Sequence, residues 1–540
     1  MIGVIADPAE HDVVREFFEL FKTPWEFYRK GEQYDALLCS GDGQFESGAK
    51  LVLVYSGRSM QFDVEQNVQT RPQRKHCILS YQTDRIPIYG DSLAFPEKDT
   101  DFLVEENSSS CVAYVDQSNE RVLARVGYDL FDEIRTLLTV GQPSVNARIP
   151  TLELHIALLR DLLTGCGLSF VEIPPVPSGH PFIACLTHDV DHPSVRQHKW
   201  DHTIFGFLNR AVFGSLGKLI RGRISGRDLV RNCAAALKLP FIYLGLAKDF
   251  WRDFDDRYLG LEKGLPSTFF VIPFKNYAGQ TADGPAPPFR AARYEAQDIT
   301  NTIQKLIAAN CEIGLHGIDA WFNGSEGRKE VAEVRRLTGT TEIGVRMHWL
   351  YQSQESPACL EEAGAAYDST IGYNEAVGYR SGATQVYKPL TARQLLELPL
   401  HAMDTALFYP VHLGLSSRQA QKLLNQLSDN AIRFGGCLTI NWHDRSLAPE
   451  RLWGECYRGA VADLGKRNAW FSTAGGAVAW FRKRRAAVFD SDCTPGNVRV
   501  SVKDNHSNSL PGLRLRIHKA RELGAIGCQS SQDFVDSALN

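Results

Sequence analysis

Apolar residues recur at two different spacings along the chain, and both spacings occur before residue 175. Short apolar runs at Ile2–Ala6 and Leu51–Tyr55 alternate with the helical spacing of Glu10–Phe21 and Thr151–Gly165. Apolar residues three and four positions apart share one face of a helix, whereas a short continuous apolar run is typical of a buried strand. Residues 1–175 are therefore predicted to form a small α/β domain, for which the sequence indicates no role.

A proline-rich segment, Pro174–Pro181, separates this part from a longer series of predicted strands and helices. The strands expected after it are Phe182–Thr187, Thr268–Ile272, Glu312–His316, Glu342–Arg346, Leu396–Leu400, Cys437–Trp442 and Ala469–Ser472. Alternation of strands and helices over about 300 residues predicts a parallel sheet, and the number of strands favours a barrel over an open sheet. Residues 486–540 are expected to form a short β-rich C-terminal appendage.

The composition is that of an ordinary globular protein, with 44% hydrophobic and 23% charged residues and a net charge of −4. This near balance excludes a strongly basic nucleic-acid-binding protein. No run approaches the ~20 apolar residues of a transmembrane helix, and no basic segment followed by an apolar core marks a signal peptide at the start. The 12 cysteines are scattered, which is typical of reduced thiols. We therefore expect a cytoplasmic protein.

Polar residues cluster where the predicted strands end. Asp189 and Asp191 follow the first strand after the linker, and residues i and i+2 of an extended backbone point to the same side. Two neighbouring carboxylates require a cation or a shared proton to offset their repulsion. The later strand ends carry His316, Asp319, Arg346, His348 and His443. Because the carboxyl ends of parallel strands meet at one edge, the joint pattern predicts a metal-dependent hydrolase, although each residue alone has a structural alternative.

In their order and spacing these residues resemble the polysaccharide deacetylases that share the NodB homology domain, carbohydrate esterase family four. The resemblance covers about residues 180–485. Its motifs are Thr187-His-Asp-Val-Asp191, Ser267-Thr-Phe-Phe-Val271, Gly314-Leu-His316, Arg346-Met-His348-Trp349, Leu398-Pro-Leu400 and Ile440-Asn-Trp-His443. The resemblance implies a distorted (β/α) barrel, a divalent metal ion such as zinc, and hydrolysis of N-acetyl groups on amino sugars.

The resemblance also implies a role for individual residues. Asp189 matches the general base and Arg346 the residue that orients it, while Asp191 and His316 match metal ligands. His443 matches the general acid, with Asp404 as a candidate partner that keeps it protonated. Ala320 stands where the family has its second metal-binding histidine.

Catalytic zinc sites usually have three protein ligands, so a third ligand is expected from another position. Asp319 is favoured because it lies three residues after His316, near enough on one turn to reach the same side. His348 is the other candidate, because it replaces a proline of the family motif. A site with no third protein ligand stays open.

Four aromatic residues near these motifs could stack on sugar rings or pack in the core, namely Trp349, Tyr351, Trp321 and Trp442. Three functions stay open. The first is an N-deacetylase acting on an amino-sugar glycan or a lipid-linked precursor. The second is a glycan-binding barrel that has lost catalysis, and the third is an amidase acting on a small non-sugar amide.

The segment Ile204–Lys238 combines apolar residues with many basic residues and the single acid Asp228. Its basic residues are Arg210, Lys218, Arg221, Arg223, Arg227, Arg231 and Lys238. Such a stretch can contact an anionic membrane surface or a lipid-phosphate carrier. A helix that covers the barrel and leaves a basic face in solvent is the favoured interpretation, and membrane contact is the alternative.

Overall fold

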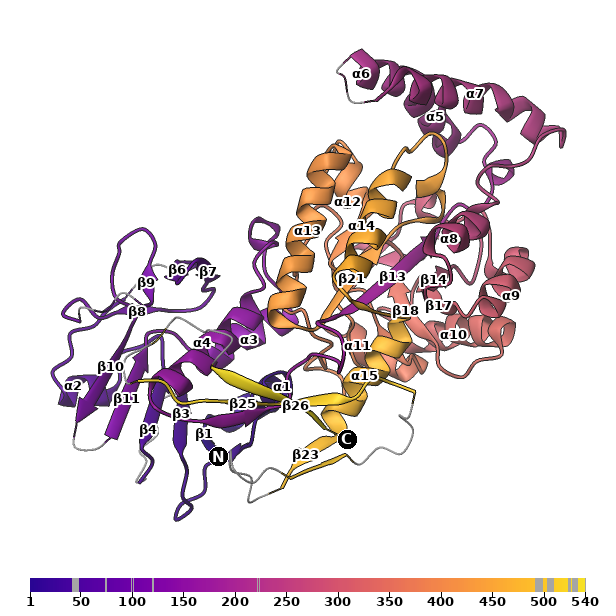
Figure 1. Cartoon of the computed structure of the whole chain (residues 1–540). Helices are drawn as coiled ribbons and strands as arrows, with labels where there is room; N and C mark the ends of the chain where they lie inside the picture. The colour runs from indigo at the N-terminus through magenta and orange to yellow at the C-terminus, as the bar shows by residue number, and fades with distance from the viewer. Residues whose placement is uncertain are drawn as a thin grey trace.

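The structure is a computed structural model that describes residues 1–40, 48–72, 75–98, 100, 102–118, 121–220, 222, 224–490, 499–502, 509–522, 526 and 533–539. Within these residues an N-terminal α/β unit lies beside a larger unit of strands and helices, and a helical arm projects from the larger unit (Figure 1).

The larger unit is built on a curled parallel sheet. Its strands follow the spatial order β19-β18-β17-β14-β13-β21-β20, and β22 pairs with β13. The strands are β13 (Ile183–Val190), β14 (Thr268–Val271), β17 (Glu312–Gly317), β18 (Gly344–Met347), β19 (Tyr367–Asp368), β20 (Ala402–Met403), β21 (Cys437–Asn441) and β22 (Trp470–Ser472). The accompanying helices are α8 (Phe254–Glu262), α9 (Thr300–Ala308), α10 (Gly324–Thr338), α11 (Ser356–Ala363), α12 (Asp404–Phe408), α13 (Ser417–Phe434), α14 (Gly454–Lys466) and α15 (Ala474–Ala486). This is the distorted (β/α) barrel that the sequence predicted.

Strand β13 is the centre of the barrel sheet, and every one of its residues is buried. Its first part pairs with β21 and β22, and its last residues pair with β14. Because all these neighbours are parallel to it, the residues that follow β13, β17, β18 and β21 are brought to the same edge.

One predicted strand is wrong. Leu396–Leu400 contains only isolated bridges, from Glu397 to Asp368 and to Tyr387. Pro399 lies inside this run and has no N–H to donate to a strand ladder. The two-residue strands β19 and β20 take part in the sheet instead, and they are too short to produce a pattern in the sequence.

The N-terminal unit contains a six-stranded sheet in the order β10-β11-β4-β3-β1-β2, parallel except for the β10–β11 pair. Its strands are β1 (Ile2–Ile5), β2 (Trp25–Phe27), β3 (Ala36–Ser40), β4 (Leu51–Tyr55), β10 (Ala113–Ser118) and β11 (Arg121–Val126). Alternate residues of β4 enter different apolar clusters, with Leu53 packed among the helix residues and Val54 on the opposite face. The helices on the Leu53 side are α1 (His11–Leu20), α3 (Leu130–Thr139) and α4 (Thr151–Gly165).

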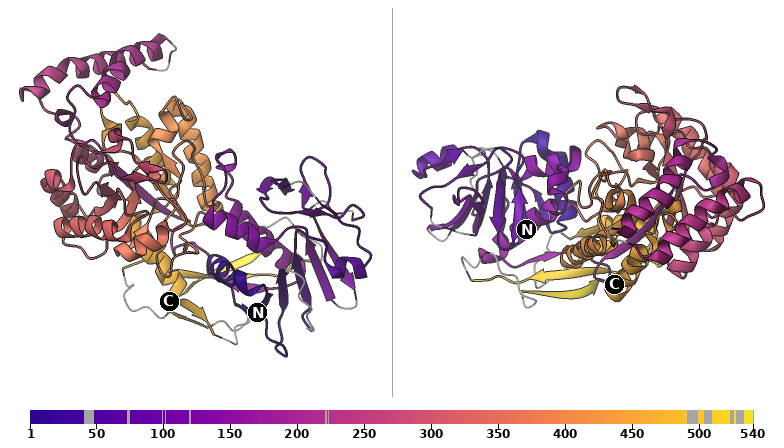
Figure 2. Two further views of the ribbon diagram at one scale, coloured as in Figure 1. Left: turned by 180° about the vertical axis from the view of Figure 1, so that it is seen from behind. Right: turned by 90° about the horizontal axis from the view of Figure 1, so that it is seen from above.

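The end of the chain returns to the N-terminal unit (Figure 2). Strand β25 (Leu513–His518) pairs with β12 (Phe170–Glu172) and with β26 (Phe534–Leu539). The side chain of Arg484, in α15, donates hydrogen bonds to the carbonyl oxygens of Glu19, Leu20 and Ile173. The last helix of the barrel is therefore bound to the N-terminal unit by buried polar contacts.

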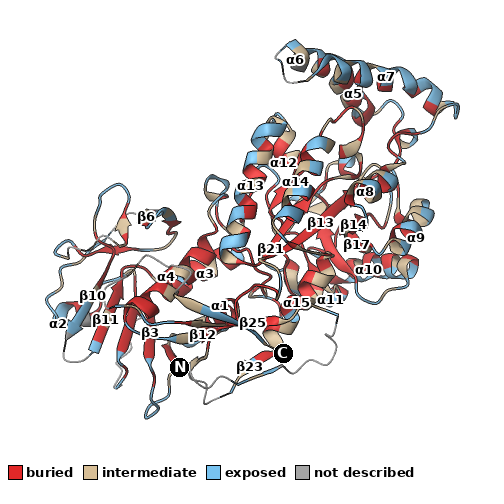
Figure 3. Ribbon diagram, viewed as in Figure 1, coloured by how far each residue is buried: buried red, intermediate tan, exposed pale blue. Residues whose placement is uncertain are grey.

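The helical arm comprises residues 202–243, between β13 and α8. It contains α5 (His202–Leu208), a π-helical stretch (Asn209–Gly214), α6 (Ser215–Ile220) and α7 (Gly226–Tyr243). Its inner face buries Phe207, Leu239 and Ile242 in a small cluster with Trp251, while much of its outer surface is exposed (Figure 3). Arg221 and Arg223 lie outside the described residues. Among the helices that the structure describes, none has the length and apolar content needed to cross a bilayer.

Candidate active site

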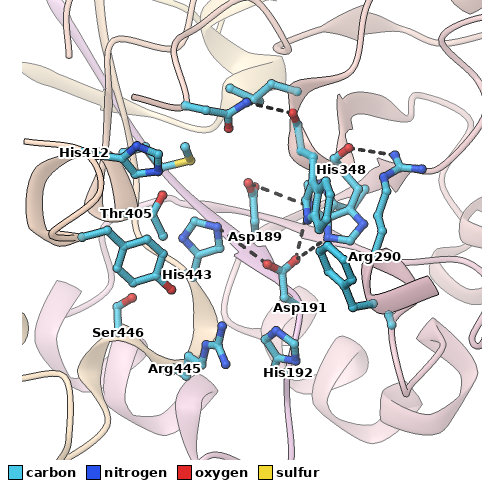
Figure 4. Close-up of a pocket in the computed structure, with 18 of the residues that line it drawn as sticks. Asp189, Asp191, His192, Arg290, His348, Thr405, His412, His443, Arg445 and Ser446 are labelled. Carbon is cyan, nitrogen blue, oxygen red and sulfur yellow. Dashed lines mark hydrogen bonds and ion pairs between the residues drawn. The ribbon is translucent and has the colours of Figure 1, made fainter. Parts of the chain in front are cut away.

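The polar residues predicted from the strand ends converge on one pocket of about 410 Å³. Asp189 lies at the end of β13 and Asp191 just after it, and both face the pocket. In Figure 4 the two carboxylates lie between His443 on one side and His348 on the other. His188, which points away from them, is bound in the core between the Trp442 carbonyl and Glu262.

Both oxygens of Asp189 are held in place. Arg346 Nη1 donates to Asp189 Oδ1 at 3.0 Å, and Asn441 Nδ2 donates to Oδ2 at 2.8 Å. Arg346 is fully buried and is itself bound to the Thr187 hydroxyl and to Ser369. The sequence prediction that Arg346 orients Asp189 agrees with this geometry.

Asp191, His316 and His348 form a cluster whose ligand atoms all lie within 4.8 Å of one another. Asp191 Oδ1 is 3.4 Å from His316 Nε2 and 3.8 Å from His348 Nε2. His316 Nδ1 is 2.9 Å from the Arg346 carbonyl oxygen, which requires the proton on Nδ1 and leaves the lone pair on Nε2. Burial lowers the pKa of His348 to about 3, so its imidazole is neutral at pH 7.

This cluster fits a divalent metal ion. Asp191 Oδ1 is buried and has no hydrogen-bond partner among the described residues, although a buried carboxylate oxygen normally has one. One carboxylate and two neutral imidazoles are a donor set that zinc accepts. Ligand atoms about 2.1 Å from a tetrahedral ion are roughly 3.3 Å apart, close to the separations from Asp191 to the two histidines.

His443 lies on the other side of Asp191, with its Nε2 3.7 Å from Asp191 Oδ2. Its Nδ1 is 2.6 Å from Asp404 Oδ1, and its backbone N–H donates to Asp404 Oδ2. Although burial alone would lower the pKa of His443, Asp404 and, to a smaller extent, Asp191 and Asp189 raise it to about 10. The pairing of Asp404 with His443 was predicted as a candidate, and the structure brings the two residues together.

Three predicted site residues lie elsewhere. Asp319 is not part of the metal-ligand cluster, because its carboxylate accepts hydrogen bonds from the Tyr277 hydroxyl and the Gln280 backbone N–H. Trp321 packs in the core beside Phe322, and Trp442 is fully buried against neighbouring aromatic rings. The favoured third ligand was therefore wrong in position, and His348 takes its place in the cluster.

Trp349 and Tyr351 do line the pocket. Trp349 and Leu350 both have a positive φ, 66° and 55°, which is unfavourable for residues with bulky side chains. Strain of this kind persists only where the surrounding structure enforces it, and it is frequent at functional sites. The turn places His348 in the cluster and the Trp349 ring against Phe289 at the pocket.

Sequence reasoning missed several residues of the pocket. Asn441 lies inside the His443 motif, so its position beside Asp189 could have been proposed. Arg290 ends a short 3₁₀ helix (Pro288–Arg290) that no apolar pattern marks, and its buried guanidinium donates to the carbonyl oxygens of Ile318 and His348. Arg445 and Arg451 line the same pocket after β21, and no spacing rule pointed to them.

A scan against protein-family models finds no match, and no curated protein is significantly similar in sequence. Among solved structures, the chain is similar to one assigned as a polysaccharide deacetylase from Mycobacterium smegmatis, with 16% identity and a TM-score of 0.36 over 57% of this chain and 94% of that chain. PuuE allantoinase is similar at 16% identity and a TM-score of 0.34, over 57% and 92%.

The carbohydrate deacetylase Agd3 is similar at 9% identity and a TM-score of 0.35, over 100% of this chain and 98% of that chain. Two of these structures are described as deacetylases of polysaccharide or carbohydrate, the class that the sequence motifs resemble. Likeness at these identities and scores says nothing about the reaction or the substrate.

Proposed function

We propose that this protein is a metal-dependent hydrolase that removes N-acetyl groups from an amino-sugar glycan or a glycan precursor. The observation that carries the proposal is the arrangement around Asp191. Asp191 belongs to a cluster of three possible metal ligands, and its Oδ1 has no hydrogen-bond partner among the described residues. Asp189, whose carboxylate is held by Arg346, lies next to this cluster. His443, which is hydrogen-bonded to Asp404, lies on the other side of Asp191. Metal-assisted amide hydrolysis uses a metal ion, a general base and a general acid in one pocket.

Each residue has a distinct task in this reaction. Asp191, His316 and His348 hold the ion, for which zinc is the proposed identity, and when bound it polarises the amide carbonyl and lowers the pKa of water. Asp189 accepts the proton of the attacking water, in an orientation set by Arg346 and Asn441.

His443 donates a proton to the nitrogen as the C–N bond breaks, because an amine leaves poorly as an anion. Its pKa of about 10 keeps it protonated at neutral pH. The products are acetate and the free amino sugar. Trp349 and Tyr351, which line the same pocket, supply the aromatic surface on which a sugar ring packs.

The alternative of a glycan-binding barrel without catalysis depended on a metal site with too few ligands. His348 supplies a third donor atom, which favours an active enzyme. For the alternative of an amidase acting on a small non-sugar amide, the pocket contains no feature that favours it over an amino sugar.

The test incubates the zinc-loaded protein with chitooligosaccharides, nucleotide-linked amino sugars and cyclic amides, and measures acetate release from the sugars and ring opening of the cyclic amides. We expect acetate from an amino sugar, and a fall in kcat of about 10²–10⁴-fold in His443→Gln with zinc retained. His412→Gln is the matched control, because His412 lines the same pocket but stacks on Tyr409 rather than pairing with Asp404. Zinc-loaded protein that releases no acetate from any amino sugar would refute the proposal.

A further inference from the structure

The wall of the pocket on the side of His443 carries positive charge, and within the described residues no carboxylate forms an ion pair with the guanidinium groups of Arg445 and Arg451. Arg445 and Arg451 both line the pocket (Figure 4 shows Arg445 on this side). Burial, and then the charges of Arg451 and Arg445, lower the pKa of Arg210 in the helical arm, and burial together with the charge of Arg451 lowers the pKa of Arg445. A cluster of arginines is unfavourable unless an anion offsets their repulsion.

Arg451 is the best-defined member of this cluster. Only 2% of the residue is exposed, and its Nε and Nη1 have no hydrogen-bond partner among the described residues. The guanidinium lies 5.2 Å from the centre of the Tyr409 ring and 4.7 Å from that of Trp453, so two aromatic faces hold it in place. A buried guanidinium with unsatisfied N–H groups is costly unless a ligand accepts them.

The nearest acids are directed to other partners. Glu450 Oε1 accepts a hydrogen bond from Trp251 Nε1 at 3.1 Å. Asp444 accepts the backbone N–H groups of Arg445 and His192. Arg451 has a side-chain hydrogen bond with Tyr409, whereas its Nε and Nη1 are left for a ligand. Although burial raises the pKa of Tyr409, the charges of Arg451 and Arg445 lower it.

We propose that Arg445 and Arg451 form an anion subsite beside the reacting centre, and that the substrate is an amino sugar with a phosphate or carboxylate group on the part that faces His443. This inference deepens the proposed function and rests on it for the identity of the sugar. The planar fork of arginine matches both anions through paired N–H groups.

The subsite is tested by calorimetric binding to zinc-loaded Asp189→Asn protein, in which turnover does not interfere. The probes are N-acetylglucosamine 1-phosphate, the 2-acetamido uronic acid and the neutral methyl glycoside. We expect at least one charged sugar to bind about 10-fold or more tightly than the neutral one. In Arg451→Met the ratio of the two Kd values should fall to about one.

Arg458→Met is the matched control, because Arg458 is an exposed arginine of α14 paired with Glu455 and should leave the ratio unchanged. If Arg451→Met does not fold, Arg445→Met carries the same expectation. Charged sugars that bind no more tightly than the neutral one, or a preference that survives both variants, would overturn the subsite. Absence of acetate release with intact preferential binding would instead count against the proposed function alone.

The outer surface of the helical arm supports a second, independent inference. Of the large hydrophobic side chains that are exposed in the described residues, more than half lie between Trp200 and Leu246. In α7 they include Val230, Leu237 and Phe241, followed by Leu244. Spacings of seven, four and three residues place these four on one helix face. Because Leu239 and Ile242 already bury another face, this apolar stripe is additional to the core contact.

The arm is also basic. Between residues 195 and 248 the sequence has ten lysines and arginines against the two acids Asp201 and Asp228, in a chain of net charge −4. Exposed Arg227, Arg231 and Lys238 are interleaved with the apolar stripe of α7. We infer that the arm docks on an anionic lipid surface, with the stripe in the interface and the basic residues at the headgroups.

Flotation with phosphatidylcholine vesicles that contain about one quarter phosphatidylglycerol tests this inference. The full chain should float with them and stay in solution with phosphatidylcholine alone. Leu237→Gln/Phe241→Gln should lose most of the flotation, whereas Val140→Gln/Val145→Gln, which changes two exposed valines of the N-terminal unit, should not. Absence of flotation, or a wild-type dimer that Leu237→Gln/Phe241→Gln converts to a monomer, would overturn it.

Discussion

Two buried clusters of charged residues, one in each unit, differ in how many of their polar atoms have a hydrogen-bond partner in the protein. In the N-terminal unit the fully buried Arg125 donates to both oxygens of Asp63 and to the carbonyls of Ser56, Arg58 and Val126. In the barrel, Asp191 Oδ1 and two nitrogens of Arg451 have no hydrogen-bond partner among the described residues. The first cluster is satisfied by the chain itself, whereas the second has the unpartnered atoms on which the proposed metal and anion sites rest.

The largest effect on activity is expected from changing Asp189, the proposed general base. Asp189→Asn keeps the hydrogen bond with Arg346 possible but removes the proton acceptor, so kcat for acetate release should fall by about 10⁴-fold. Zinc content, measured by elemental analysis, should remain at the wild-type level. Loss of zinc in this variant would make Asp189 a ligand and would reverse its role with that of Asp191.

Breaking the Arg125–Asp63 cluster should lower the stability of the protein. Arg125→Met leaves the Asp63 carboxylate buried without its partner, and we expect a loss of about 3–5 kcal/mol in the free energy of unfolding of the N-terminal unit. Urea denaturation measures it. Arg29→Met, which breaks the exposed pair with Glu26, should cost less than about 1 kcal/mol. Equal losses of unfolding free energy in the two variants would contradict a stabilising role for the buried Arg125–Asp63 pair.

Changing a residue of the cluster around Asp191 should weaken metal binding. His348→Ala removes one of the three donor atoms and should weaken zinc binding by about 10–100-fold or more. Asp319→Ala should leave the zinc Kd unchanged, because that carboxylate binds Tyr277 and Gln280 instead. Competition with a zinc-sensitive dye distinguishes the two variants, and the opposite ranking would restore Asp319 as the ligand.

The smallest effect concerns pH. Burial raises the pKa of Glu133, in the N-terminal unit, to about 7 in the folded protein, compared with 4.5 for an ordinary glutamate. The folded state keeps this proton between those pH values while the unfolded state has lost it, so stability falls as pH rises from about 4.5 to 7. The contribution is at most about 3 kcal/mol.

Glu133→Gln imitates the protonated form and keeps an acceptor for the Gly90 N–H. The difference in unfolding free energy between wild type and variant should shift in favour of the variant across this range and level off above pH 7. Glu65→Gln, in an exposed glutamate, is the control and should leave the slope unchanged. A wild-type slope that survives in Glu133→Gln would show that Glu133 is not the titrating group.

Much of the fold was predictable because the longer strands and helices have local patterns, unlike the two-residue strands β19 and β20. Six of the seven strands expected in the barrel are present, and the α/β pattern before residue 175 produced the elements it predicted. The strand predicted at Leu396–Leu400 is absent for a local reason as well. Pro399 disfavours a strand there, but the prediction gave more weight to the apolar pattern. Among site residues, Asp189, Asp191, His316, Arg346 and His443 were placed correctly at one edge by their positions at strand ends.

The sequence by itself determined which side of its own element each residue faces, since backbone periodicity is local. Asp189 and Asp191 share a side of β13 for that reason. Which residues of other elements each side chain contacts was decided only by the tertiary structure. It turned Asp319 toward Gln280, brought His348 to Asp191, buried Trp321 and Trp442, and placed Arg451 between two rings. These contacts join residues far apart in sequence, and packing rather than periodicity selects them.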